Sequence, residues 1–360
     1  SEPEKLIALS KEQLRNNNFN QSIDILKNAI NLAEKKFGGE SDIELVLFYN
    51  KYADAFLEKI MLASNNDINV SNIKETATEN SNNPKTNKQK LESQIAFEYL
   101  NKANIILKKY LEKYDDKDPS TLDKEIIKYY LYLGYNYNLF AILEKINLDF
   151  EKATEYYKLS INYTKKYENK FSRNLASLYF ELAQILIYDP FNCLLCLYKS
   201  KVIMEYYLQN EINKANLDIK LIIDEKDLDL DKISYNSDKI FKNKKIIESN
   251  VDLIKEMEAN LDIKEFVDII KDINNKIENV ISEINEYVFY VKNKEQKEKG
   301  ENNNGNSQEN LDFDFGVNND VFNMKMNKIG VINLKRSEPT NNDSDIKKME
   351  EEDYSKEKYI

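Results

Sequence analysis

Small residues recur along the first half of the chain at spacings that restrict how it can fold. The same gaps of 12 and 7 positions separate the members of two triplets: Ser10, Ser22 and Ala29, and Ala141, Ala153 and Ser160. A small side chain on each of two successive helices lets their axes approach closely. The spacing therefore predicts pairs of antiparallel helices that stack on one another and share a continuous core.

Two further copies of the pattern are less regular. They consist of Ala53, Ala96 and Ala103, and of Ala183, Cys193 and Ser200. In the first of them the two helices are separated by residues 64–90, which are rich in Asn, Thr and Lys and show no apolar periodicity, so we expect a disordered loop there. The spacing is typical of the tetratricopeptide repeat. We therefore predict an all-α chain in which residues 4–210 form a right-handed superhelical array of four such repeats.

After residue 210 the pattern stops. Residues 211–245 are charged and predict a connector, and residues 246–292 predict one long helix. Apolar residues along that helix alternate gaps of four and three, as in a heptad seam: Phe266, Ile270, Ile273, Ile277, Val280, Ile284 and Tyr287. The seam indicates either a helix that caps the last repeat or a coiled coil that forms a homodimer. The polar residues 293–360 predict a disordered tail, in which the acidic and aromatic segment 311–316 is a hypothetical docking motif.

Composition excludes several classes of function. The chain contains no histidine, which rules out a Ser-His-Asp triad and any metal site that needs His. Its formal net charge of -11 argues against direct nucleic-acid binding through phosphate neutralisation and favours a basic partner. No apolar run is long enough to predict a transmembrane helix. We therefore expect no enzymatic activity, cofactor, metal, nucleic acid or membrane partner.

The cysteine pair Cys193-x-x-Cys196 is the one candidate for metal or redox chemistry. The chain has no other cysteine and no histidine to complete a zinc site, and the strand-to-helix context of a redox CxxC is absent. Both cysteines fall on one face of a predicted helix, and Cys193 occupies a small-residue position. We therefore predict that the pair has a structural role.

Several segments resemble, in their order along the chain, the nuclear autoantigenic sperm protein family, which are histone chaperones with an interrupted tetratricopeptide array. Residues 33–38 (AEKKFG) are similar to the end of the family's first repeat, and residues 52–58 (YADAFLE) to the signature of its second. The polar segment 64–90 follows where the family interrupts that repeat. Residues 148–153 (LDFEKA) and 173–176 (RNLA) resemble the turn of the third repeat and the opening of the fourth.

The resemblance implies a chaperone for histone H3 or H3–H4, with linker histone H1 as a further cargo. It implies storage, transport and chromatin assembly in the nucleus, with a cytoplasmic pool and exchange with other histone chaperones rather than ATP hydrolysis. In the family a helical H3 segment lies in the groove lined by the first helices of the repeats. The corresponding positions here are Asn50, Asp54, Glu58, Tyr135, Asn138, Ser177, Phe180 and Gln184.

The chain also departs from the family. Ser177 stands where the family has a groove glutamate, and Asp54 where it has lysine. The insert 64–90 mixes acids with lysines, whereas the family's insert is strongly acidic. We hypothesise that carboxylates of the connector supply a replacement acidic surface: Asp224, Glu225, Asp227, Asp229 and Asp231.

Two alternatives stay open. The same groove could hold a different partner, which would make the chain a scaffold or adaptor subunit of another complex. It could also take an acidic C-terminal peptide, as a co-chaperone does, but this needs a strongly basic groove. The charge of the groove therefore discriminates: an acidic or mixed groove favours histones, and a basic one favours the carboxylate clamp.

Overall fold

The computed structural model describes residues 2–71, 84–168, 171–186, 188–223, 229–231 and 237–300. The chain divides into two compact units, residues 1–296 and 297–360, and the second is described only over 297–300. In these ranges every regular element is a helix, which confirms the predicted all-α class. None of the described helices is both long and apolar enough to cross a membrane.

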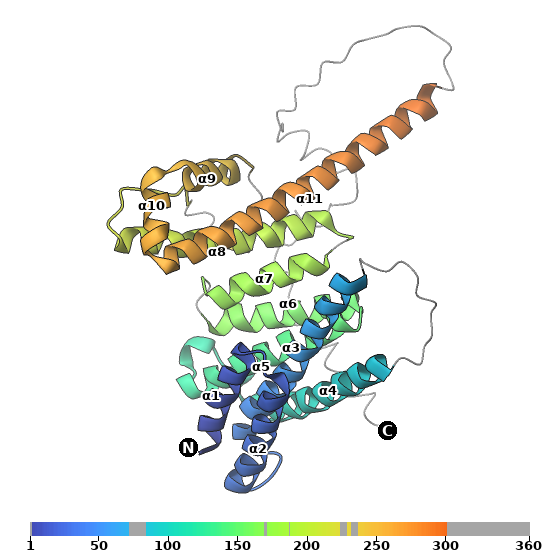
Figure 1. Cartoon of the computed structure of the whole chain (residues 1–360), viewed down its shortest axis with the longest axis vertical. Helices are drawn as coiled ribbons and strands as arrows, with labels where there is room; N and C mark the ends of the chain where they lie inside the picture. Colours follow the sequence, from blue (N-terminus) through green and yellow to red (C-terminus); the bar gives the residue numbers. More distant parts are fainter. Residues whose placement is uncertain are drawn as a thin grey trace. The chain divides into compact units, whose positions relative to one another are not determined.

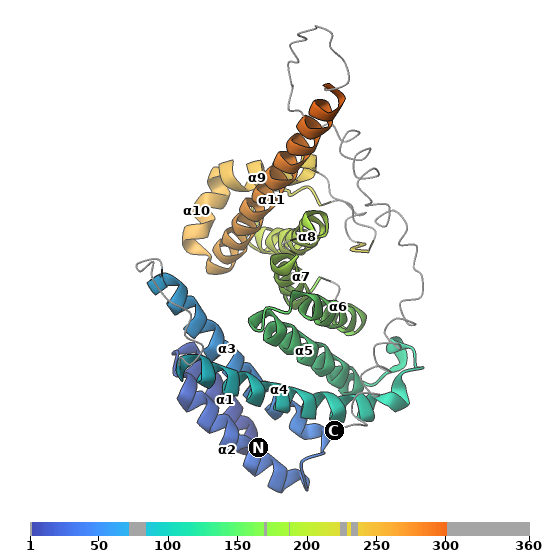
Figure 2. The same cartoon turned by 90° about the vertical axis from the view of Figure 1, so that its right-hand side faces the viewer.

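The array begins with four consecutive helix pairs (Figure 1). They are α1 (Glu2–Arg15) with α2 (Phe19–Phe37), α3 (Val46–Ser71) with α4 (Pro84–Leu111), α5 (Lys124–Ile146) with α6 (Phe150–Tyr167), and α7 (Arg173–Ile185) with α8 (Pro190–Lys214). The second helix of each of the first three pairs also packs against the first helix of the next pair, and Figure 2 shows α5, α6, α7 and α8 following one another in this way. The fold is thus a tetratricopeptide-like array, as predicted.

The small residues explain how closely the paired helices approach. All of the repeated small residues are buried except Cys193, which is half-buried. In the first pair the hydroxyl of Ser22 donates to the carbonyl oxygen of Ser10 at 3.1 Å. In the fourth pair the thiol of Cys193 donates to the carbonyl oxygen of Ala183 at 3.3 Å. In these two pairs the equivalent small residue of the second helix therefore contacts the equivalent small residue of the first helix.

Aromatic rings fill the interface between α5 and α6. The rings of Tyr130 and Tyr167 are parallel with centroids 4.2 Å apart, and Tyr137 stacks on Tyr163 at 5.7 Å. Gly134 lies beside them, and a β-carbon there would be 3.1 Å from the Cβ atom of Tyr163. Glycine therefore lets the backbone of α5 approach α6 closely here, and a larger residue would require Tyr163 to shift by a few tenths of an ångström.

The predicted loop at residues 64–90 is shorter than expected. Helix α3 continues to Ser71 and α4 already begins at Pro84, which leaves residues 72–83 outside the described part of the chain. No Pro or Gly interrupts residues 62–71, and Pro84 suits the first turn of a helix because its missing N–H would have no partner there. The lack of an apolar stripe in residues 64–90 did not predict where the helices end. A helix that packs in a pair over part of its length can continue past the packed part.

The connector 211–245 is also partly ordered. Helix α8 extends to Lys214, and α9 (Ser237–Ser249) begins before residue 245. Between them, the extended stretch 217–223 is held by two side-chain amides. Gln209 of α8 accepts from the backbone N–H of Leu221 at 2.6 Å, and Asn243 of α9 both accepts from and donates to the backbone of Ile222. These amides supply hydrogen-bond partners for the backbone of Leu221 and Ile222, which lie outside any helix.

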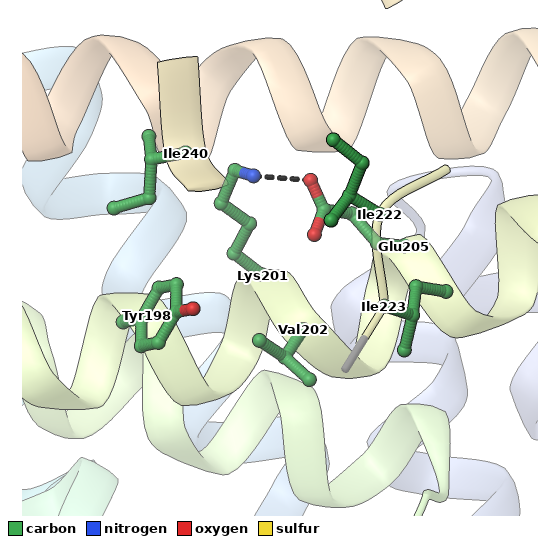
Figure 3. A pocket seen from close by; sticks show the side chains of 7 residues that line it. All are labelled: Tyr198, Lys201, Val202, Glu205, Ile222, Ile223 and Ile240. Carbon is green, nitrogen blue, oxygen red and sulfur yellow. Dashed lines mark hydrogen bonds and ion pairs between the residues drawn. The ribbon is translucent and has the colours of Figure 1, made fainter. Parts of the chain in front are cut away.

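A buried ion pair lies beneath this stretch (Figure 3). Lys201 and Glu205, one turn apart on α8, pair with each other and are almost inaccessible to solvent. Ile222 and Ile223 of the extended stretch and Ile240 of α9 surround them, around a cavity of about 10 Å³. The C-terminal part of the chain thus covers two charges on the last helix of the array.

Residues 246–292 do not form one helix. The chain breaks after α9, forms the short α10 (Val251–Ala259), and breaks again before α11 (Leu261–Gly300). Both breaks occur at an asparagine that caps the next helix. Asn250 accepts from the N–H groups of Asp252 and Leu253, and Asn260 from those of Asp262 and Ile263. Helix α11 then runs past residue 293, where the tail was predicted to begin; residues 301–360, with the hypothetical motif 311–316, lie outside the described residues.

The heptad seam of α11 is buried within the single chain. Its members Phe266, Ile270, Ile273, Ile277 and Ile284 are buried and Val280 is half-buried, while the side chain of Tyr287 is not described. The ring of Phe266 stacks on Tyr207 of α8 at 5.6 Å. This packing favours a cap on the last repeat over a dimer seam.

Candidate functional site

The best-defined polar cluster on the first helices of the repeats lies between α3 and α5. Lys51, Asp54 and Glu58 follow one another on a single face of α3, because three and four residues make about one helical turn. The ammonium group of Lys51 is 3.3 Å from the carboxylate of Asp54, whose side chain is only 17% exposed. One face of α3 therefore presents two carboxylates and one cation.

Tyr135 of α5 completes the cluster. Its hydroxyl donates to the carboxylate of Asp54 at 2.5 Å and accepts from the ammonium of Lys51 at 2.7 Å. The same ammonium lies 4.5 Å from the centre of the Tyr135 ring. Burial, followed by the charge of Asp54, raises the pKa of Tyr135 well above its usual value, so the phenol stays protonated and keeps donating to the carboxylate.

Glu58 differs from Asp54 in having no partner. Within the part of the chain that the structure describes, its carboxylate makes no hydrogen bond or ion pair, although it is half-buried. Burial, and next the charge of Asp54, raise the pKa of Glu58 above its usual value of 4.5, against the opposing effect of Lys51. An incoming cation would stabilise its ionised form.

The basic groups further along the same helices are already compensated. Lys145 of α5 lies 2.9 Å from the carboxylate of Glu181 of α7, which also accepts from Gln184 at 3.2 Å. Arg173 of α7 pairs with Glu265 of α11 and lies over the ring of Phe266. The charge on these helices is therefore mixed, which differs from the strongly basic surface that a carboxylate clamp requires.

Asn50 does not belong to the exposed face on which the resemblance had placed it. It is fully buried, and its side-chain oxygen accepts from the amide of Asn136 at 2.7 Å. Asn136 in turn accepts from Asn104 at 2.9 Å. The three amides join α3, α4 and α5 within the core, which is a structural role, since buried polar groups need such partners.

The other expected groove residues are distributed over two helices. Asn138 is half-buried on α5, whereas Ser177 is exposed on α7. Phe180 is half-buried, and the ammonium of Lys276 from α11 lies 4.9 Å from the centre of its ring. Helix α11 therefore reduces the surface that α7 offers to a partner.

The acidic connector is described only in part. Asp231 forms an ion pair with Lys165, and Asp229 accepts from the backbone N–H of Asp231 at 3.2 Å. Both carboxylates thus have partners within the chain. Asp224, Glu225 and Asp227 lie outside the described residues.

Lys51 of α3 and Glu181 of α7 are two polar residues of the first helices that the resemblance did not single out. Lys51 lies three positions before Asp54, and Glu181 four positions after Ser177, so both are on the faces already singled out. A search for charged residues one turn from the predicted positions would have found them.

The cysteines show no sign of activated chemistry. Neither forms a disulfide, and burial raises the pKa of Cys193 to about 11 and that of Cys196 to about 12. At neutral pH both are thiols, whereas the thiolate is the form that reacts and binds metals. Over the described ranges no group of three or more acidic or cysteine side chains could hold a metal ion.

Comparison with known proteins adds no relative to these observations. No protein-family model matches the chain, and no curated protein matches it. The surface formed by α3 and α5 therefore has to be interpreted from its own geometry.

Proposed function

We propose that this chain is a non-enzymatic histone chaperone that binds histone H3 or H3–H4 on the surface formed by α3 and α5. The observation that carries the proposal is Glu58, a half-buried carboxylate one turn from Asp54 that forms no hydrogen bond or ion pair with a described residue. A lysine or arginine of a bound helix would give this carboxylate a direct ion pair, in addition to the weaker effect of Lys51. Histones are rich in such side chains.

The arrangement of Tyr135 supports the same proposal. Tyr135 and Lys51 hold Asp54 in place, so this carboxylate is positioned before a partner arrives. Fixed charges lose less conformational entropy on binding than flexible ones. The ring of Tyr135 also offers apolar area next to the charges, a combination common in protein interfaces.

The mixed charge of α5 and α7 supports a histone over an acidic peptide as the ligand. The resemblance described above supplies the remaining parts of the proposal, which are nuclear residence with a cytoplasmic pool, chromatin assembly, linker histone as a further cargo, and exchange with other histone chaperones.

A titration of the full chain against labelled H3–H4, and against a peptide from the C-terminal helix of H3, at two salt concentrations tests the proposal. We expect sub-micromolar binding that persists at physiological salt. Glu58→Gln should weaken it about fivefold, or about 1 kcal/mol. Glu155→Gln, an exposed glutamate on α6, is the matched control and should have no effect.

The opposite result is equally clear. Absence of binding, or binding that modest salt abolishes and that responds equally to Glu58→Gln and Glu155→Gln, would reveal only generic charge attraction. In that case the interpretation as a scaffold for another partner would replace the histone proposal.

A further inference from the structure

A second surface lies at the other end of the array, where α9, α10 and α11 surround a cavity of about 390 Å³. Ile247 of α9 and Ile254 and Met257 of α10 form its apolar lining. The charged side chains around them are Glu248, Glu258, Lys264 and Lys271. One asparagine, at residue 250 or 260, separates each helix from the next and caps the helix that follows. These two short connections hold α9, α10 and α11 around the cavity.

Helix α10 has apolar side chains that are not buried within the chain. Leu253 is fully buried and attaches the helix to the rest of the unit. Ile254, in contrast, is 45% exposed and Val251 is 60% exposed, and Leu261 at the start of α11 is also exposed. Ile254 lines the cavity, and Val251 lies about one turn before it on the same helix. Exposed apolar side chains grouped in this way mark interaction sites.

The charges around the cavity differ in sign between its two sides. Lys264 and Lys271 are seven positions apart on α11, or about 10 Å along one face of the helix. Neither forms an ion pair with a described residue, and the same is true of Glu258 on α10. Glu248 of α9 lies 4.0 Å from Lys244. On the α11 side the cavity is therefore lined by two lysines that form no ion pair with a described residue, whereas the charged lining residues of α9 and α10 are glutamates.

We propose that this cavity is a docking site for an amphipathic helix of a partner protein. The apolar stripe of that helix would cover Ile254 and Met257, and two acidic residues seven positions apart on its flank would pair with Lys264 and Lys271. Charge complementarity with Lys264 and Lys271, neither of which forms an ion pair with a described residue, identifies the occupant. The site is separate from the α3 and α5 surface and does not depend on histone binding. The chain would thus hold two different partners at once.

Two designed helical peptides test the proposal by fluorescence anisotropy with the full chain. The first has leucines along one stripe, two glutamates seven positions apart on one flank and lysines on the other. The second replaces the two glutamates by lysines. We expect the chain to prefer the first peptide by about tenfold, or about 1.4 kcal/mol. The chain variant Lys264→Glu/Lys271→Glu should reverse this preference, because it exchanges the sign of the contact.

A third variant examines the apolar contact. Ile254→Asp places a charge on a side chain that is already exposed, so the fold should be retained, and we expect binding of the first peptide to fall at least about tenfold. Leu148→Asp, at an exposed leucine between α5 and α6, is the control and should bind normally. Thermal unfolding of all variants verifies that they are folded.

Three results would overturn the proposal: equal affinity for the two peptides, no binding of either, or normal binding by Ile254→Asp. Self-association of the chain that Ile254→Asp abolishes would also overturn it, since a second copy would then be the occupant. The peptides contain no histone sequence, so these outcomes are independent of the histone titration.

Discussion

The hydroxyl of Tyr135 on α5 donates a hydrogen bond to the carboxylate of Asp54 on α3, 2.5 Å away, and so joins the first helices of two neighbouring repeats. Tyr135→Phe removes this bond and leaves a largely buried carboxylate with one partner fewer. We expect a loss of about 1.5–3 kcal/mol in the free energy of unfolding, measured by chemical denaturation. Tyr132→Phe is the matched control, because the hydroxyl of Tyr132 makes no hydrogen bond to a described residue, and it should change stability by less than about 0.5 kcal/mol.

Glu58 makes the stability of the fold depend on pH. Its pKa is higher in the folded chain than the usual 4.5, so the folded state binds the proton more tightly, and this contribution to stability is lost as pH rises through the raised pKa. Glu58→Gln should therefore unfold at a higher temperature than the natural chain at neutral pH, and at the same temperature below pH 4.5. Circular dichroism melts at both pH values check this. A lower melting temperature for Glu58→Gln at neutral pH would show that the carboxylate has a partner in solution.

Two buried tyrosines should respond in opposite ways to loss of the hydroxyl. The hydroxyl of Tyr157 is buried and has no hydrogen-bond partner among the described residues, so Tyr157→Phe should be neutral or stabilise the chain by up to about 1 kcal/mol. The hydroxyl of Tyr49 bonds to the carboxylate of Glu34 at 3.0 Å, and Tyr49→Phe should cost about 1.5–3 kcal/mol. Urea titrations of both variants measure the difference. Equal effects would contradict the contrast between the two sites.

The ion pair of Lys201 and Glu205 should show strong coupling. Lys201→Met leaves Glu205 buried without its partner and should cost about 3–5 kcal/mol. The double change Lys201→Met/Glu205→Leu removes both charges and should be close to neutral or stabilising. A double-mutant cycle by chemical denaturation checks this. Additive losses would mean that water reaches the pair when the chain is folded.

The helix pairs could be predicted from sequence because they depend on short-range spacing. Ser10 and Ser22 are in contact because a separation of 12 positions, across a short turn, brings the two residues opposite each other on paired helices. The helix breaks at residues 250 and 260 were missed because each depends on one asparagine side chain that caps a helix, while the apolar pattern continues on both sides. The apolar periodicity is averaged over many residues, so it does not detect a helix break that depends on a single side chain.

The candidate site was harder to predict, because it joins residues that are far apart in sequence. Asp54 and Tyr135 are 81 positions apart, and neither residue type indicates the contact. Asn50 was placed in the groove because the resemblance puts a groove residue at its position in the second repeat. In the structure α3 packs against both α4 and α5, so its exposed stripe is narrower than helical periodicity alone suggests, and Asn50 lies in the core.

The stacked rings between α5 and α6 give this protein a built-in spectroscopic reporter. The chain has no tryptophan, so its near-ultraviolet circular dichroism arises mainly from tyrosine. Rings as close and as parallel as Tyr130 and Tyr167, 4.2 Å apart with planes inclined by 4°, couple their electronic transitions. The tyrosine band should therefore be dominated by the third helix pair, α5 and α6. The temperature at which this band disappears would report the loss of side-chain packing between α5 and α6, separately from the loss of helix elsewhere in the chain.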